Sequence, residues 1–202
     1  AGSRGIANIA AIIKAVVDEI KSQGACPFII PAMGSHGGAT AEGQRKVLEH
    51  YGITEDTMGA PIVSSMDVVS VSNEENGFRL FMAKDAYDAD GVVIVNRVKP
   101  HTDFHGPVES GLMKMCVIGL GKHAQALEMH RQGVYGLREL VPVAARKILA
   151  TGKINLGIGV VENALDETLL IKAANAEDIE NLDAELIDLA RQNMPSLPID
   201  HL

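Results

Sequence analysis

The sequence has little aromatic character, because only 3% of its 202 residues are Phe, Tyr or Trp and Trp is absent. Hydrophobic residues still make up 47%, so the core must be built from aliphatic side chains and the eight methionines. A chain of this length can bury a full core without disulfides or a structural metal. We therefore expect a globular domain held together by aliphatic packing.

Clustered positive charge is also missing. The chain carries 18 basic and 26 acidic residues, a net charge of -8, and shows no basic stripe of the kind that nucleic-acid-binding proteins use. No apolar run is long enough to span a membrane, and the first residues do not resemble a signal peptide. The sequence thus predicts a cytoplasmic protein with neither nucleic acid nor membrane as a partner.

Cysteine is scarce. Cys26 and Cys116 lie far apart in apolar runs, without the CxxC spacing of a metal or redox motif. We expect both to be buried free thiols in a reducing compartment. The chain begins at Ala1 and stops soon after a predicted long helix, so we also expect residues 1–202 to be one domain, truncated at both ends, of a longer protein.

Hydrophobic periodicity predicts an alternation of helices and strands. Helices are expected over residues 6–21, 41–51, 85–90, 110–115, 124–131, 137–150 and 177–193, and strands over 27–30, 61–66, 68–71, 78–82, 91–96 and 154–161. This pattern favours an α/β fold with a largely parallel sheet flanked by helices.

Two polar loops follow predicted buried strands. Residues 34–40 carry His36, and residues 99–107 carry His101 and His105. Ligands bind at the carboxyl ends of parallel strands, so the two loops predict one site at a shared edge of the sheet. A single loop histidine is as often merely solvated; the pair of histidine loops is what favours a function.

Lys114 and His130 each allow two interpretations. Lys114 lies among apolar residues, where a lysine either extends its amine to solvent or serves as a covalent anchor or tuned base. His130 lies near the end of a predicted helix, where it either complements the helix dipole or serves a site. The Gly119-Leu120-Gly121-Lys122 segment lacks the spacing of a phosphate-binding loop, so we exclude a nucleotide site there.

Three motifs together resemble the N-terminal domain of the nickel-pincer-dependent lactate racemase family of 2-hydroxyacid racemases and epimerases. They occur in order, cover the chain from Arg4 to about Arg131, and are Met33-Gly34-Ser35-His36, Lys99-Pro100-His101, and Ser110-Gly111-Leu112-Met113-Lys114 followed by His130. The resemblance implies a two-domain isomerase whose C-terminal domain closes over the site and is absent from these residues.

The resemblance also implies a role for each residue. Lys114 would carry the pincer nucleotide covalently, and His130 would complete the nickel coordination, a role that suits imidazole. His36 and His101 would be the two acid/base residues, one for each enantiomer, while hydride passes between C2 of the substrate and the cofactor. Arg4 would hold the substrate carboxylate. The implied partners are the 2-hydroxyacid, the C-terminal domain and the enzymes that make the cofactor.

Two features depart from the family. Gly37 stands where many members have an arginine, and the segment between His101 and Lys114 is longer and adds Asp103, His105 and Glu109. Both lie where substrate should bind, so we expect a 2-hydroxyacid other than lactate, and we expect the isolated domain to be inactive and free of cofactor.

Two other interpretations remain open. One is a metal-dependent hydrolase with zinc held by His36, His101 and His105, a set that leaves Lys114 and His130 without a role. The other is a non-catalytic domain that binds a small molecule.

Overall fold

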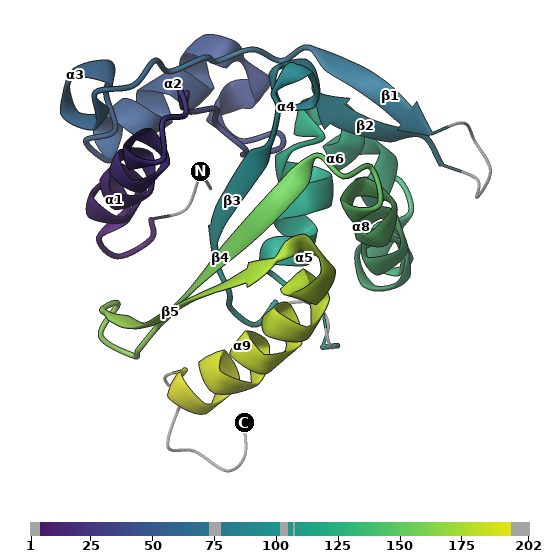
Figure 1. The fold of residues 1–202 in the computed structure, drawn as a ribbon. Coiled ribbons are helices and arrows are strands. Elements are labelled where there is room, and N and C mark those ends of the chain that lie inside the picture. The colour runs from purple at the N-terminus through teal and green to yellow at the C-terminus, as the bar shows by residue number, and fades with distance from the viewer. Residues whose placement is uncertain (1–4, 73–77, 102–104, 107, 195–202) are drawn as a thin grey trace.

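The computed structural model describes residues 5–72, 78–101, 105–106 and 108–194 (Figure 1). Its strands are β1 (Val68–Ser72), β2 (Leu80–Ala83), β3 (Val92–Arg97), β4 (Ile154–Glu162) and β5 (Thr168–Asn175). The α-helices are α1 (Ile9–Ser22), α2 (Ala41–His50), α3 (Glu55–Met58), α4 (Lys84–Asp88), α5 (Leu112–Lys114), α6 (Lys122–His130), α7 (Gly133–Tyr135), α8 (Val141–Leu149) and α9 (Ile179–Asn193). Two 3-10 segments, η1 (Gly37–Ala39) and η4 (Ala176–Asp178), and two π-helical segments, η2 (Met115–Gly119) and η3 (Gly136–Leu140), complete them. The α/β class is confirmed.

The main sheet has the order β3-β4-β5 and is mixed. β3 and β4 pair in parallel, as expected, but β5 pairs antiparallel to β4, and β1 and β2 form a separate antiparallel pair. β5 turns back because only five residues separate it from β4, too few for a crossover. The Asn163 side-chain oxygen accepts the Leu165 and Glu167 amides in this turn, at 2.9 and 3.0 Å. The sequence did not predict β5, which alternates weakly and is largely exposed.

The strands predicted at residues 27–30 and 61–66 are wrong. These extended segments meet at a single parallel bridge between Ile29 and Ile62. Pro27, Pro31 and Pro61 have no amide hydrogen to donate, which limits a longer ladder. The His36 loop therefore approaches the site from outside the main sheet rather than from the end of one of its strands.

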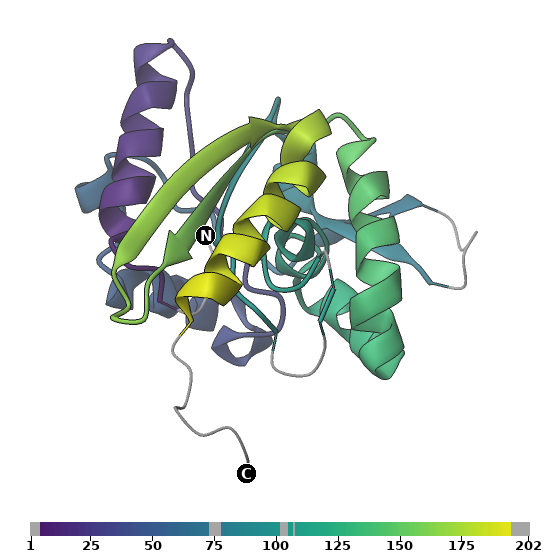
Figure 2. The ribbon, with the colours of Figure 1, turned by 90° about the horizontal axis from the view of Figure 1, so that it is seen from below.

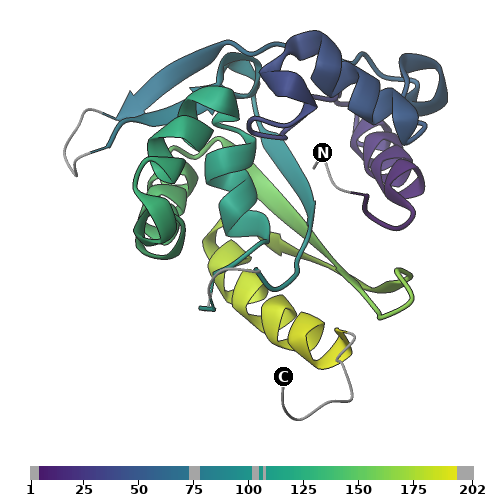
Figure 3. The same ribbon diagram turned by 180° about the vertical axis from the view of Figure 1, so that it is seen from behind.

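Helices cover both faces of the sheet. Figures 1 and 3 show α1, α2 and α3 on one side of β3, with α5, α6, α8 and α9 on the other. On the first side, Val95 and Val160 pack with α1 residues such as Ile13. No helix in the described part of the chain is long and apolar enough to cross a membrane.

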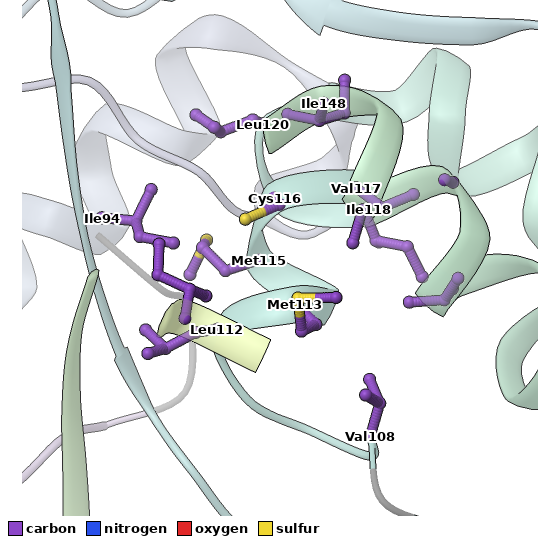
Figure 4. Close-up of a cluster of buried hydrophobic side chains, with 14 of the residues drawn as sticks. Ile94, Val108, Leu112, Met113, Met115, Cys116, Val117, Ile118, Leu120 and Ile148 are labelled. Atoms are coloured by element: carbon purple, nitrogen blue, oxygen red, sulfur yellow. The ribbon is translucent and has the colours of Figure 1, made fainter. Parts of the chain in front are cut away.

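The second side holds the larger core, and it is aliphatic and methionine-rich as expected. Ile94 of β3 packs with Leu112, Met115 and Cys116 of the central helix, which is formed by α5 and η2 and runs from Leu112 to Gly119 (Figure 4). Burial, with a smaller contribution from the charge of Asp183, raises the pKa of the Cys116 thiol. The prediction that both cysteines are buried is wrong for Cys26, which is exposed because it follows the end of α1 at the surface.

Two glycines of β4 let helices approach the strand closely. A Cβ on Gly159 would lie 2.3 Å from the Leu186 Cδ1 atom of α9, and one on Gly157 would lie 2.9 Å from Ile179 Cγ1. Figure 2 shows α9 lying across β4 and β5. The glycines thus fix α9 against the sheet.

We expect Gly159→Ala to lower the free energy of unfolding by about 1–3 kcal/mol, because the added methyl group overpacks the contact between α9 and β4. Urea denaturation followed by circular dichroism measures this. Gly5→Ala is the matched control, since its Cβ would meet nothing closer than 3.7 Å. Equal effects of the two substitutions would contradict the packing argument.

Candidate functional site

A pocket of about 380 Å³ lies beyond the end of β3. The pocket is lined by all four residues to which the family resemblance gives cofactor, metal and acid/base roles: His36, His101, Lys114 and His130. Its other lining residues are Ala32, Met33, Ser35, Asn96, Arg97, Lys99, Pro100, Ser110, Met115, Ile118, Gly119 and Leu137. Arg4 and Asp103 lie outside the described residues.

The pocket is cationic in an acidic protein. Arg97, Lys99 and Lys114 line it, and none of its described lining residues is an aspartate or glutamate. Arg97 forms an ion pair with Glu162, which also accepts the Ala7 amide at 2.7 Å. Glu162 balances the charge of Arg97, so Lys99 and Lys114 are the residues that make the lining cationic in a chain whose net charge is -8.

Two buried side chains, those of Gln44 and Lys122, hold the segment from Pro31 to His36 in place. The Gln44 amide group, fully buried on α2, donates to the Gly34 and His36 carbonyls at 2.9 and 3.1 Å. The buried Lys122 amine donates to the Pro31 carbonyl at 2.5 Å, and its burial lowers its pKa to about 8 against a smaller opposing effect of a nearby carboxylate. The loop is thus held without a strand.

Position 37 has no room for a side chain. Gly37 adopts a φ of +64°, and a Cβ there would lie 2.7 Å from the Gln44 amide nitrogen and 2.8 Å from the Gly43 carbonyl carbon. Both are backbone atoms of the first turn of α2, which cannot move aside easily. The arginine that the family resemblance places here is therefore incompatible with this loop conformation.

The His101 loop is closed at its base by Glu109. The buried Glu109 carboxylate accepts the His101 amide at 2.6 Å, the Gly106 amide at 2.9 Å and the Arg191 guanidinium at 2.5 Å. Burial alone raises the pKa of Glu109, but these bonds outweigh it and hold the pKa below its ordinary value of 4.5. Glu109, which the sequence placed near the substrate, therefore has a structural role. His105 contacts it at 3.4 Å and does not line the pocket.

Lys114 ends α5, and the helix continues directly into the π-helical η2. The Leu120 amide donates to the Met115 carbonyl at 2.9 Å, a hydrogen bond that spans five residues. Such π-helical turns are frequent at functional sites. Asn96, at the end of β3, donates to the Gly111 carbonyl at 2.9 Å and so joins this helix to the sheet.

His130 is the last residue of α6, and its ring has a defined tautomer. Its Nδ1 lies 2.6 Å from the Ala126 carbonyl oxygen, which can only accept, so Nδ1 carries the hydrogen. The Nε2 lone pair is then the one available to a metal, the usual arrangement of a histidine ligand. Gln125 anchors α6 by accepting the Phe81 amide at 2.7 Å and donating to the Arg79 carbonyl at 3.3 Å.

The chain matches the domain of unknown function DUF362 over residues 4–199. It belongs to this family. None of the curated proteins matches the sequence.

Among solved structures, the chain is similar to the lactate racemase apoprotein from Thermoanaerobacterium thermosaccharolyticum. The TM-score is 0.61 at 16% sequence identity, and the match covers 87% of this chain and 44% of that one. At this identity the likeness shows the fold alone. The DUF362 domain described here thus spans less than half the length of that structure.

A zinc site made of His36, His101 and His105 receives no support. Within the described ranges, no three His, Cys, Asp or Glu side chains gather closely enough to hold a metal. His105 lies against Glu109 with 78% of its side chain exposed, away from the lining of the pocket.

We expect Glu109→Gln to lower the free energy of unfolding by about 2 kcal/mol at pH 7, because glutamine offers one acceptor oxygen and no charge to Arg191. The folded-state pKa of Glu109 is lowered, so its stabilisation is present above the unfolded-state pKa and is lost as pH falls through the folded-state value. The difference between the two proteins should shrink as pH falls below about 4.5.

Urea denaturation between neutral and acidic pH measures this difference. Glu139→Gln, which removes an exposed ion pair with Arg138, is the control and should change stability by less than about 0.5 kcal/mol at every pH. A penalty for Glu109→Gln that does not change with pH would exclude the carboxylate as its cause.

Proposed function

We propose that this chain is the catalytic, cofactor-carrying N-terminal domain of a two-domain isomerase, a racemase or epimerase that acts on a 2-hydroxyacid. One observation carries the proposal: His36, His101, Lys114 and His130 come from four separate segments and line a single pocket. The likeness in fold to a lactate racemase apoprotein is consistent with it.

Lys114 and His130 are the residues that would hold a nickel pincer nucleotide. The Lys114 amine provides the covalent attachment, and the His130 Nε2 atom provides one metal ligand because Nδ1 is already bonded to Ala126. A single imidazole would suffice if the organic part of the cofactor supplied the other donors to the metal. When bound, the cofactor would supply a hydride acceptor for C2 of the substrate.

His36 and His101 would move the proton of the substrate hydroxyl group. Inversion at C2 leaves the hydroxyl oxygens of the two enantiomers in different positions, so each enantiomer needs its own base. Imidazole suits the task because its ordinary pKa lies near neutrality. The two histidines come from separately anchored loops, one held by Gln44 and the other by Glu109.

The charge of the pocket supports an anionic substrate. Glu162 balances the charge of Arg97, so Lys99, two residues after β3, and Lys114 are the cations of the lining that favour the carboxylate of a hydroxyacid. Since position 37 has no room for the arginine that many lactate racemases carry there, the substrate would meet a different surface at this point of the pocket. We therefore propose a substrate other than lactate, with Arg4 as a further carboxylate ligand.

The first test is the mass of the Lys114 peptide, and the nickel content, of the full-length protein co-expressed with the enzymes that make the cofactor. We expect an adduct on Lys114 and about one nickel ion per chain. Lys114→Ala should lose both, His130→Ala should keep the adduct and lose nickel, and the surface control Lys172→Ala should keep both. An unmodified Lys114, beside a lactate racemase that is modified in the same cells, would instead favour a non-catalytic binding domain.

The second test is racemisation of a panel of 2-hydroxyacids by the cofactor-loaded protein, followed by chiral chromatography. A substrate deuterated at C2 should keep its deuterium in both enantiomers, because hydride never exchanges with water. His36→Asn and His101→Asn should each lower turnover by about 100-fold or more, as expected for general acid/base residues. Loss of deuterium to solvent would exclude hydride transfer, and lactate as the best substrate would contradict the substrate assignment.

A further inference from the structure

Asp183 is a buried carboxylate that the proposed function does not use. It lies on α9 with only 1% of its surface exposed. Its Oδ1 atom accepts the Leu112 amide at 2.7 Å, and its Oδ2 atom accepts the Met113 amide at 3.1 Å. Both hydrogen bonds are made to the first two residues of α5, and Lys114 is the residue that follows them.

These bonds replace a missing local cap. The first amides of a helix have no partner within the helix, and a Ser, Thr, Asp or Asn at the preceding position usually accepts one of them. Here that position is Gly111, which has no side chain to offer. The cap therefore comes from a different helix, far away in the sequence.

Gly111 and Asp183 form a matched pair. A Cβ on Gly111 would lie 1.9 Å from the Asp183 Oδ1 atom, so the carboxylate reaches the amides only because position 111 is glycine. The charge is also unfavourable where it lies, since burial raises the pKa of Asp183 to about 6 despite the two hydrogen bonds from the helix.

We propose that Asp183 is a positioning residue for Lys114: its carboxylate fixes the start of the central helix and thereby sets how the Lys114 side chain enters the pocket. Its catalytic relevance rests on the proposed function, in which Lys114 carries the cofactor. The contact links α9, which packs across β4, to the pocket, so the position of Lys114 depends on the sheet through this helix.

The test compares Asp183→Ala and Asp183→Asn with the control Glu185→Gln, in full-length protein prepared without cofactor. Glu185 lies on the same helix and forms an exposed ion pair with Lys172. Two quantities are measured by mass spectrometry and NMR: the rate at which an amine-reactive acylating reagent modifies Lys114, and the hydrogen exchange of the Leu112 and Met113 amides.

In Asp183→Ala we expect exchange at these two amides to rise about tenfold or more, and the acylation rate of Lys114, relative to Lys153, to change about threefold or more. Asp183→Asn should restore most of both values, because asparagine also caps helices, and Glu185→Gln should change neither. If Asp183→Ala does not fold, Gly111→Ala serves in its place, because the added methyl group would displace the Asp183 carboxylate. The same changes in amide exchange and in the acylation rate are then expected.

Unchanged exchange at Leu112 and Met113 with an unchanged acylation rate of Lys114 in a folded variant would overturn the proposal. So would a rise in exchange that is equally large in α8 and β4, because that pattern reports overall stability. Neither reading needs the cofactor, so the inference and the proposed function can fail separately. With the cofactor-making enzymes present, Asp183→Ala should lower the fraction of Lys114 that carries the adduct, and Asp183→Asn should restore it.

Discussion

Hydrogen bonds from buried polar side chains to the backbone hold the pocket of this domain together. In the part of the chain that the structure describes, the fully buried polar side chains are those of Gln44, Glu109, Lys122, Gln125 and Asp183. Each bonds to backbone atoms and so anchors a segment that lines the pocket or leads to it. A buried polar group without a partner costs about 1–3 kcal/mol, so these contacts select one arrangement of each segment.

The anchors matter because the pocket is built from loops and helix ends rather than from one regular element. The His36 loop has no strand before it, and the His101 loop joins its ends through a single bridge between Lys99 and Ser110. The central helix begins at a glycine. In each case a side chain from elsewhere supplies the hydrogen bonds that a ladder or a local cap would otherwise provide. The result is a cationic pocket whose walls are tied to an aliphatic core.

Prediction from sequence succeeded where the signal is local. Apolar spacing located α1 and α9, and a short β-branched run located β3. Thr40, a residue type that often caps helices, directly precedes the helix predicted at 41–51, and its hydroxyl oxygen accepts the Gly43 amide at 3.0 Å. The prediction failed where the formation of a strand depends on pairing with a distant segment. The segment at 27–30 is apolar but joins no sheet. β5 is exposed and polar in places, yet it pairs along its length with β4.

The sequence by itself determined the α/β class, because periodicity is a property of neighbouring residues, and its ordered motifs, which resemble a known family, singled out His36, His101, Lys114 and His130 as candidates. Only the tertiary structure decided that these four share one pocket, that Glu109 supports a loop, and that Asp183 caps the helix of Lys114. The Asp183 contacts join residues 71 and 70 positions apart, and no local pattern specifies such a pairing. The need for glycine at position 111 becomes clear only in the folded protein, where α9 packs beside it and the Asp183 carboxylate occupies the space that a side chain would fill.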